Sequence, residues 1–465
     1  MPTIKTLIIC VTLKALAFTA TPLWADDEIS IKQYDDGSVY KGTFRDGIRH
    51  GSAKYITPNG FTYTGQWIDG QISGQGIAKY PNGSYYQGQF SNGKPHGQGN
   101  ITFADGGSYH GNWLNGEIFG KGIARYVNGS IYVGNFNKAK HHGLGKLTAL
   151  SGFIYRGEWL NGQQIGSATI TYADGSKYEG SMLNGKRYGQ GTLKFEDAIF
   201  YSGGWANDQF SGIGYLKNSN GEIYEGRFQN GQRYGVGKAI YSNGDIYTGN
   251  FEDDTRHGKG IFTSIKGHII DGQWVNGSVQ GNATTTFVDG SKYIGEYLAG
   301  KQHGLGFLTY SDGGAYSGNW TNGSIEGQGT ATFADGTVYV GNFKNAQNHG
   351  NGKITYPDGF SYEGEWYDGI KQGKGIEFQT DGSTYDGMFK AGSPHGVGTL
   401  TLINGFSYVG EWADGRISGA GIATFENGDV YVGNFSEGQP NGQGKMAYKS
   451  GDVFDGIWDK GTKVR

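Results

Sequence analysis

Apolar and polar residues alternate along the chain. In the stretch YTGQWIDGQISGQGIAKY, which begins at Tyr63, a tyrosine, a glycine and a tryptophan occupy every second position, with polar residues between them. Because side chains alternate between the two faces of a β-strand, this pattern predicts a strand with one ring-and-glycine face and one polar face. The glycines of the returning strand, Gly74 and Gly76, have the same parity, and so much internal glycine excludes a helix.

The pattern repeats every 23 residues without an insertion. A glycine stands two residues after every repeat start, and an aromatic ring stands four residues after it except at Met182. Further glycines stand eleven and, in most repeats, thirteen residues after the start, where Ala53, Ala168 and Ala283 are the exceptions. The nineteen starts are Tyr40, Tyr63, Tyr86, Tyr109, Tyr132, Tyr155, Tyr178, Tyr201, Tyr224, Tyr247, Ile270, Tyr293, Tyr316, Tyr339, Tyr362, Tyr385, Tyr408, Tyr431 and Phe454.

Each repeat contains two turn signals, such as Asp69-Gly70 and Asn82-Gly83. Such pairs suit tight hairpin turns that need positive backbone φ angles, so two turns per repeat predict two short strands per repeat. A glycine between two rings on one face leaves room for a neighbouring ring. It also tolerates the bulges and curvature that would wrap the apolar face inward.

A longer period overlies the repeat. The tryptophans four residues after a start recur every 46 residues from Trp67 to Trp205, and again from Trp274 to Trp458. DGGSYHGNW from Asp105 matches DGGAYSGNW from Asp312 at an offset of nine repeats. This match predicts an internal duplication of about residues 30–236 and 237–443.

The motif Tyr-x-Gly-x-Phe/Trp-x-Asn/Asp-Gly, followed by His/Ser-Gly-x-Gly, closely resembles the MORN repeat. The resemblance covers residues 35–465, after a short lead-in at residues 26–34. It implies an all-β fold, an elongated single-layer antiparallel sheet of consecutive hairpins with an aromatic-lined groove. It also implies a role in assembly or at membrane junctions. In this family enzymatic activity belongs to separate attached domains, so we expect no catalytic residues and no cofactor.

The first 25 residues differ in composition from the repeats. They contain Lys5 and Lys14 between apolar runs and no acidic residue, which predicts a secretory signal peptide cleaved after Ala25. The expected location is therefore exported, periplasmic or extracellular. A membrane anchor is the rival interpretation, but neither apolar run approaches the roughly 20 residues that span a bilayer. Cys10 is the only cysteine, so the mature chain would have no disulfide and no thiol nucleophile.

The charge balance bears on the class of partner. The mature chain would have 37 basic and 42 acidic residues, a formal net charge of −5. This balance argues against nucleic acid as a partner, and it weakens electrostatic docking on anionic lipid.

The residues able to do chemistry follow the repeat. The Gly-x-Gly pairs precede no helix and no Gly-Lys-Ser/Thr, which excludes a phosphate loop. Histidines such as His50 and His96 recur every two repeats, roughly 19 Å apart in a sheet and too far for one zinc ion. Acidic residues concentrate in turns and do not form a catalytic pair. An alternative interpretation applies to the acidic stretch EDD at residues 252–254, which could bind a cation weakly. We predict no catalytic and no metal-binding residue.

The ring face is the one feature that predicts a ligand site. Its rings either fill the face themselves or leave part of a groove open for an extended partner, and tyrosine and tryptophan suit both protein contacts and sugar stacking. The candidate groove residues are Tyr63, Trp67, Tyr109, Trp113, Tyr155, Trp159, Tyr201, Trp205, Trp274, Tyr316, Trp320, Tyr362, Trp366, Tyr408 and Trp412.

Three functions fit these observations. The leading hypothesis is a non-catalytic exported scaffold that mediates protein–protein interaction or assembly, with a homodimer as one form. The alternative is an envelope-binding protein that takes lipid or polysaccharide in its aromatic groove. The third is a targeting protein whose partner enzyme is encoded separately.

Overall fold

A computed structural model describes residues 28–195 and 200–464, and these residues form strands and turns without a helix. The chain divides into two compact units between Arg187 and Tyr188. The predicted signal peptide, residues 1–25, lies outside the described residues. The all-β fold class predicted from the repeat is confirmed.

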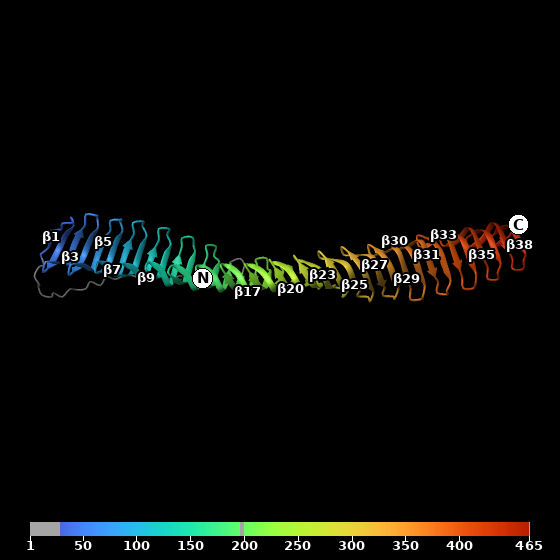
Figure 1. The fold of residues 1–465 in the computed structure, drawn as a ribbon, viewed down its shortest axis with the longest axis horizontal. Coiled ribbons are helices and arrows are strands. Elements are labelled where there is room, and N and C mark those ends of the chain that lie inside the picture. The colour runs from blue at the N-terminus through green and yellow to red at the C-terminus, as the bar shows by residue number, and fades with distance from the viewer. Residues whose placement is uncertain (1–27, 196–199, 465) are drawn as a thin grey trace, which may run out of the picture. The chain divides into compact units, whose positions relative to one another are not determined.

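The first unit is an antiparallel sheet in which every strand pairs with its neighbours in the chain (Figure 1). The predicted lead-in at residues 26–34 contains its first strand. The strands are β1 (Ser30–Gln33), β2 (Val39–Arg45), β3 (Ile48–Ile56), β4 (Thr62–Ile68), β5 (Gln71–Lys79), β6 (Tyr85–Ser91), β7 (Lys94–Thr102), β8 (Ser108–Leu114), β9 (Glu117–Arg125), β10 (Ile131–Asn137), β11 (Lys140–Thr148), β12 (Ile154–Leu160), β13 (Gln163–Thr171) and β14 (Lys177–Leu183).

The second unit has the same construction. Its first strand, β15, begins just before the boundary, and the predicted duplication boundary at 236/237 falls within this unit. The strands are β15 (Lys186–Lys194), β16 (Phe200–Ala206), β17 (Gln209–Lys217), β18 (Ile223–Gln229), β19 (Gln232–Ile240), β20 (Ile246–Glu252), β21 (Thr255–Thr263), β22 (Ile269–Val275), β23 (Ser278–Thr286), β24 (Lys292–Leu298), β25 (Lys301–Thr309), β26 (Ala315–Thr321), β27 (Ser324–Thr332), β28 (Val338–Lys344), β29 (Gln347–Thr355), β30 (Ser361–Tyr367), β31 (Ile370–Phe378), β32 (Thr384–Lys390), β33 (Ser393–Thr401), β34 (Ser407–Ala413), β35 (Arg416–Thr424), β36 (Val430–Ser436), β37 (Gln439–Ala447), β38 (Val453–Asp459) and β39 (Thr462–Lys463).

Most hairpins contain a β-bulge, as β4 and β5 illustrate. Gly65 pairs with Gly76 and Trp67 pairs with Ile72, so the register shifts between the two pairs. Gly74, at the bulge, has a φ of +78°, a conformation that favours glycine. The glycine eleven residues after each start is therefore required by the backbone.

The two turns of a repeat differ from each other. Asp69 and Gly70 both have positive φ and join β4 to β5 as a two-residue turn, as predicted. At the other end Tyr80 N–H donates to the Ser84 carbonyl at 2.8 Å, which closes a five-residue loop. In that loop Gly83 has a positive φ and Asn82 does not, since the Asn82 side chain accepts the Ser84 N–H instead. The prediction of two equally tight turns was wrong for this second turn.

The glycine pair at the centre of each hairpin makes room for a ring. A Cβ atom added to Gly76 would lie 2.3 Å from the Tyr63 hydroxyl oxygen, and one added to Gly65 would lie 2.5 Å from it. The tyrosine therefore lies across the glycines of its own hairpin. The expected role of glycine is confirmed, and the ring that it accommodates is the start tyrosine of the same hairpin.

Candidate functional site

All fifteen candidate groove residues lie on the ring face, the sheet face onto which the repeat-start side chains project. Their exposed fractions run from 0% to 8%. Tyr63 packs edge to face against Trp67 of its own repeat at 5.8 Å between ring centroids, and against Phe90 of the next at 5.1 Å. In most repeats the structure thus packs these rings against rings of the next repeat. Ligand binding by these rings stays a prediction.

The tyrosine hydroxyls are also satisfied within the fold. Tyr63 donates to the Gln66 carbonyl at 3.0 Å, and Tyr316 donates to the Asn319 carbonyl at 3.1 Å. Burial raises the pKa of both Tyr63 and Tyr316 to about 12. Because these phenols are neutral and hydrogen-bonded, they are poorly suited to act as general bases.

In several repeats the residue nine positions after the start covers the rings from the returning strand. Phe210 stacks on Tyr201 with 3.7 Å between centroids, and His141 stacks on Tyr132 at 3.6 Å. The Arg256 guanidinium lies 4.3 Å from the centroid of Trp274. Burial lowers the pKa of His141 to about 4, so this imidazole is neutral at ordinary pH.

One of the two repeats that do not start with tyrosine is joined to its neighbour by a hydroxyl contact. It begins with Ile270, so no hydroxyl is available there, and Ala283 takes the place of the second glycine. Tyr297 stands where most other repeats have phenylalanine or tryptophan, and its hydroxyl contacts the buried Thr285 hydroxyl at 2.5 Å. This hydroxyl contact joins the exceptional repeat to the one that follows it.

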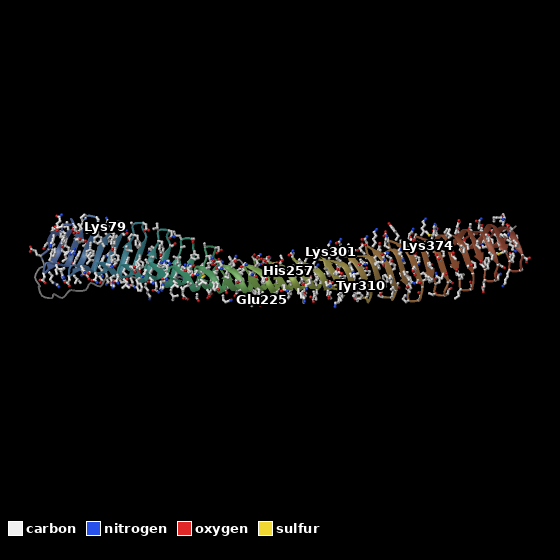
Figure 2. The ribbon with its side chains drawn as sticks, viewed as in Figure 1. Lys79, Glu225, His257, Lys301, Tyr310 and Lys374 are labelled. Carbon is white, nitrogen blue, oxygen red and sulfur yellow. The ribbon has the colours of Figure 1, made fainter. Side chains whose placement is uncertain are left out.

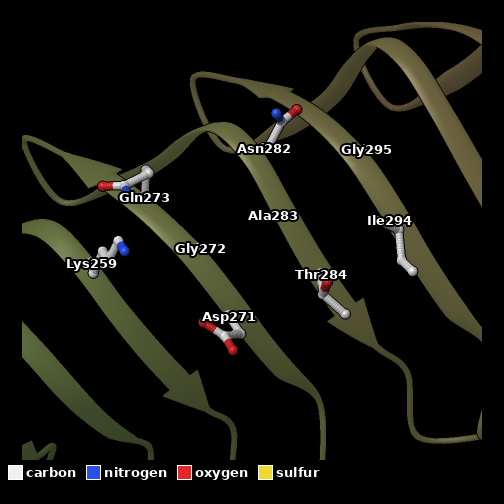
Figure 3. A pocket seen from close by; sticks show the side chains of 9 residues that line it. All are labelled: Lys259, Asp271, Gly272, Gln273, Asn282, Ala283, Thr284, Ile294 and Gly295. Carbon is white, nitrogen blue, oxygen red and sulfur yellow. The ribbon is translucent and has the colours of Figure 1, made fainter.

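The opposite face, which we call the outer face, has open hollows. One hollow in the second unit, of about 610 Å³, lies above Gly272 and Gly295 and is lined by the side chains of Lys259, Asp271, Gln273, Asn282, Thr284 and Ile294 (Figure 3). These side chains stand on neighbouring strands and offer amide, hydroxyl and charged groups. The first unit has a similar hollow, with Ile123, Val133 and Leu144 among its lining residues.

Large apolar side chains are exposed on the outer face, which corrects the prediction of a polar face. Ile294, Leu305 and Phe307 are 48%, 62% and 45% exposed, and Ile294 pairs directly with Phe307 across β24 and β25. We call these three residues the outer patch. Sequence reasoning missed them because the positions they occupy hold polar residues in many other repeats. A large side chain at a position that is polar elsewhere was the available signal.

The titratable side chains pair locally. His349 Nδ1 lies 3.3 Å from an Asp368 carboxylate oxygen in the next repeat. Within the EDD stretch, Asp254 accepts hydrogen bonds from the Arg233 backbone N–H at 2.9 Å and from its Nε at 3.1 Å. Across residues 28–195 and 200–464, no three histidine, cysteine or acidic side chains gather as metal ligands would. The same residues include no helix long and apolar enough to cross a membrane.

The family model for the MORN repeat matches the chain eighteen times. The matched residues are 40–62, 63–85, 86–108, 109–131, 132–152, 155–177, 178–197, 201–223, 224–246, 247–269, 271–292, 293–315, 316–338, 339–361, 362–384, 385–406, 408–430 and 431–453. Their spacing reproduces the 23-residue register, and the match that begins at residue 271 omits the exceptional Ile270. No curated protein matches the chain.

Solved structures show only low overall similarity. The TCP domain of Drosophila melanogaster SAS-4, in complex with a proline-rich motif of Ana2, is 13% identical; the alignment covers 33% of this chain and 85% of that one, with a TM-score of 0.22. The TCP10 domain of Danio rerio CPAP, in complex with a STIL peptide, is 11% identical over 58% of this chain and 94% of that one, with a TM-score of 0.16. An inactive variant of virginiamycin B lyase from Staphylococcus aureus is 10% identical over 61% and 91%, with a TM-score of 0.12. Scores this low carry no argument about function.

Proposed function

Because this chain belongs to the MORN repeat family, we propose that it is a non-catalytic scaffold that binds other proteins through the outer face of its hairpins. The ring face already packs against itself, so the outer face is the sheet surface with unpartnered apolar side chains. The outer patch of Ile294, Leu305 and Phe307 is the observation that carries the proposal. Contiguous exposed apolar residues rimmed by polar ones are typical of protein interfaces.

The geometry favours binding over chemistry. Around the outer patch the polar groups are amides, hydroxyls and isolated charges on separate strands, as Lys259 and Asp271 illustrate (Figure 3). A catalytic site would need a nucleophile, an acid or a base brought into mutual contact. Side chains spread over several strands suit a broad contact surface.

The test is crosslinking in cells followed by mass spectrometry of captured proteins, with parallel assays for lipid and glycan. The full chain is compared with a double variant of the outer patch, Leu305→Gln with Phe307→Gln. The matched control is Leu183→Gln, which changes an exposed leucine of the first unit. A protein captured by the natural chain and the control, and lost with the double variant, is the expected result.

Two results would contradict this proposal. Capture of glycan or lipid without protein would favour the envelope-binding alternative. A protein partner retained by the double variant would place binding elsewhere.

We also propose that the scaffold is exported, which rests on the pattern of residues 1–25. Fractionation of cells that express the tagged full chain tests this. The expected result is a shortened chain outside the cytoplasm, and a full-length cytoplasmic chain would contradict it. A homodimer is one proposed assembly, which sedimentation of the purified chain at several concentrations tests.

A further inference from the structure

An aromatic ladder lies along the loop margin of the second unit, where each long strand ends in its five-residue loop. We call the rings Phe287, Tyr310, Phe333 and Tyr356 the margin ladder. Tyr310, Phe333 and Tyr356 are 41%, 47% and 36% exposed, in contrast to the buried repeat-start tyrosines. Tyr310 is labelled at this margin in Figure 2. Each ring opens a loop of the same geometry, in which Tyr310 N–H donates to the Gly314 carbonyl.

Small residues separate the rings of the ladder. The loops that start at the first three rings end in Ser291, Gly314 and Thr337, and all three are buried. In the loops on either side of this series a ring occupies the position: Tyr356 lies 5.5 Å from Phe360, and His268 lies 5.5 Å from Phe287. The four rings of the ladder therefore flank three gaps. A ring in the place of the small residue ends the series on each side.

A row of carboxylates runs beside the ladder. The loops carry Asp289, Asp312, Asp335 and Asp358, all exposed, at the same place in four successive repeats. One oxygen of each accepts a loop N–H, as in the 2.8 Å bond from Thr337 N to Asp335. These bonds hold the pKa of Asp289 and of Asp335 below the ordinary value, so both side chains are anions at neutral pH. A ligand that binds along the ladder therefore lies next to a negative charge at each ring, or rung, of the ladder.

The spacing of the rungs selects the conformation of a bound chain. Neighbouring rings are two strands apart, about 9.6 Å at roughly 4.8 Å per strand. A polyproline II helix advances about 9.3 Å in each turn of three residues, so every third residue would meet a new rung. In an extended β-strand, side chains on one side recur every ~6.7 Å. This distance does not match the spacing of the rings, so the side chains would no longer meet the rings after the first one.

We propose that the margin ladder binds a proline-rich segment in the polyproline II conformation that carries lysine or arginine at every third position. Its prolines lie in the gaps between rings, and its basic side chains pair with the aspartate row. Aromatic grooves recognise proline-rich segments in this way, because the ligand is already extended and loses little entropy. Three gaps accommodate about ten residues. This proposal rests on the proposed scaffold function, and it names one class of partner at a second surface, distinct from the outer patch.

The first unit provides a natural comparison. Tyr80, Phe103 and Tyr126 stand at the equivalent positions nine repeats earlier, again with small residues between them. The acidic row is mostly absent there, since the loops carry Asn82, Asp105 and Asn128. The first unit therefore has the rings without most of the charge, and we expect it to bind the same segment more weakly.

The test uses the purified full chain and a synthetic twelve-residue peptide of four Pro-Pro-Arg units, with binding measured by fluorescence anisotropy. Controls are a peptide of Pro-Pro-Glu units and a scrambled basic peptide. We expect the basic repeat peptide to bind, with an affinity that falls as salt rises. Replacing two rungs, Tyr310→Ala with Phe333→Ala, should weaken binding roughly tenfold. Asp312→Asn with Asp335→Asn should remove most of the salt dependence.

Matched variants separate this inference from general loss of structure. Phe103→Ala with Tyr126→Ala makes the same change in the first unit, and we expect it to have the smaller effect. Hydrogen exchange in β25 and β27 must be unchanged in the tested variants. Equal binding of the scrambled peptide, or full binding by Tyr310→Ala with Phe333→Ala, would overturn the proposal. Rung-dependent binding of a soluble neutral glucan in place of the peptide would assign the ladder to sugars and overturn it too.

The two proposals fail separately. If the cellular partner is lost with the outer-patch variant but retained with the ladder variant, and the peptide does not bind, the scaffold stands and the ladder inference falls. If the peptide binds the ladder while no cellular protein depends on the outer patch, the ladder stands and the outer face is not the scaffold's binding surface.

Discussion

Two tyrosines of one repeat, Tyr293 and Tyr310, show how position decides what a ring does. Tyr293 has no exposed surface, and its hydroxyl donates to the Glu296 carbonyl at 3.0 Å. Tyr310 is 41% exposed and opens a loop. Tyr293 lies across the glycine pair Gly295 and Gly306, which gives its ring a flat bed, whereas Tyr310 lies beyond the end of the strand. The same side chain supports the fold in one place and is available to a partner in the other.

The strongest test of this contrast is truncation of each ring. Tyr293→Ala should destabilise the surrounding hairpins by about 3–5 kcal/mol, because a buried aromatic ring leaves a cavity. Tyr310→Ala should cost less than about 1 kcal/mol, as exposed substitutions usually do. Because repeat arrays need not unfold in one step, hydrogen exchange of amides in β24 and β25 is the appropriate measurement. Similar exchange in the two variants would remove the contrast.

A smaller loss of stability is expected from a substitution at Gly318, one of the glycines across which a repeat-start tyrosine lies. A Cβ atom there would lie 2.4 Å from the Tyr316 hydroxyl oxygen and 2.5 Å from the Gly329 Cα. Gly318→Ala should therefore cost about 1–3 kcal/mol through overpacking. Ser317→Ala, on the outer face, is the matched control and should be nearly neutral. A neutral Gly318→Ala, by local hydrogen exchange in β26 and β27, would show that the ring does not need the glycine.

The buried phenols predict a loss of stability at alkaline pH. Burial raises the pKa of Tyr63, Tyr201 and Tyr408 to about 12, against about 10 in an unfolded chain. Below pH 10 both states are protonated and the contribution is complete. Above it the unfolded state ionises first, so stability falls as the pH rises from about 10 through about 12. Phenolate absorbance recorded together with circular dichroism should show the buried tyrosines ionising as the sheet is lost. Full ionisation near pH 10 with an intact sheet would contradict the burial.

The smallest expected effect lies in a two-residue turn. Ala346 occupies the second turn position with a φ of +60°, where most repeats have glycine. Since left-handed backbone costs a residue with a Cβ about 1–2 kcal/mol and glycine costs roughly 0.5–1 kcal/mol in entropy, Ala346→Gly should stabilise slightly. Thermal unfolding of the variant should begin at a slightly higher temperature. A clear decrease would indicate a contact of the alanine methyl group.

Much of the fold could be predicted because the same sequence pattern recurs in every repeat. The 23-residue register predicted two strands per repeat, one tight Asp-Gly turn and a face of rings accommodated by glycines. The bulge at Gly74 and the five-residue loop at Asn82 depend on backbone register, which similar turn dipeptides do not distinguish. The contact between Tyr297 and Thr285 joins two repeats and could not be read from either one.

The binding surfaces were harder to predict, for a physical reason. A periodic motif reports what all repeats share, and that is the packing of the rings. Leu305 and Phe307 occur at positions that are polar in many other repeats, so they belong to no shared motif. Asp312 and Asp335 were interpreted as turn residues, which their hydrogen bonds support. Their alignment into one exposed row becomes visible only when the hairpins are stacked.

The most direct test of the account is hydroxyl-radical labelling of side chains on the folded full chain, read by mass spectrometry. We predict that Phe307 and Tyr310 are labelled readily, while Tyr316 and Trp320 react much more slowly until the chain is unfolded. Labelling of Tyr316 and Trp320 at rates similar to those of Phe307 and Tyr310 in the folded chain would contradict it, because the ring face would then be an open groove.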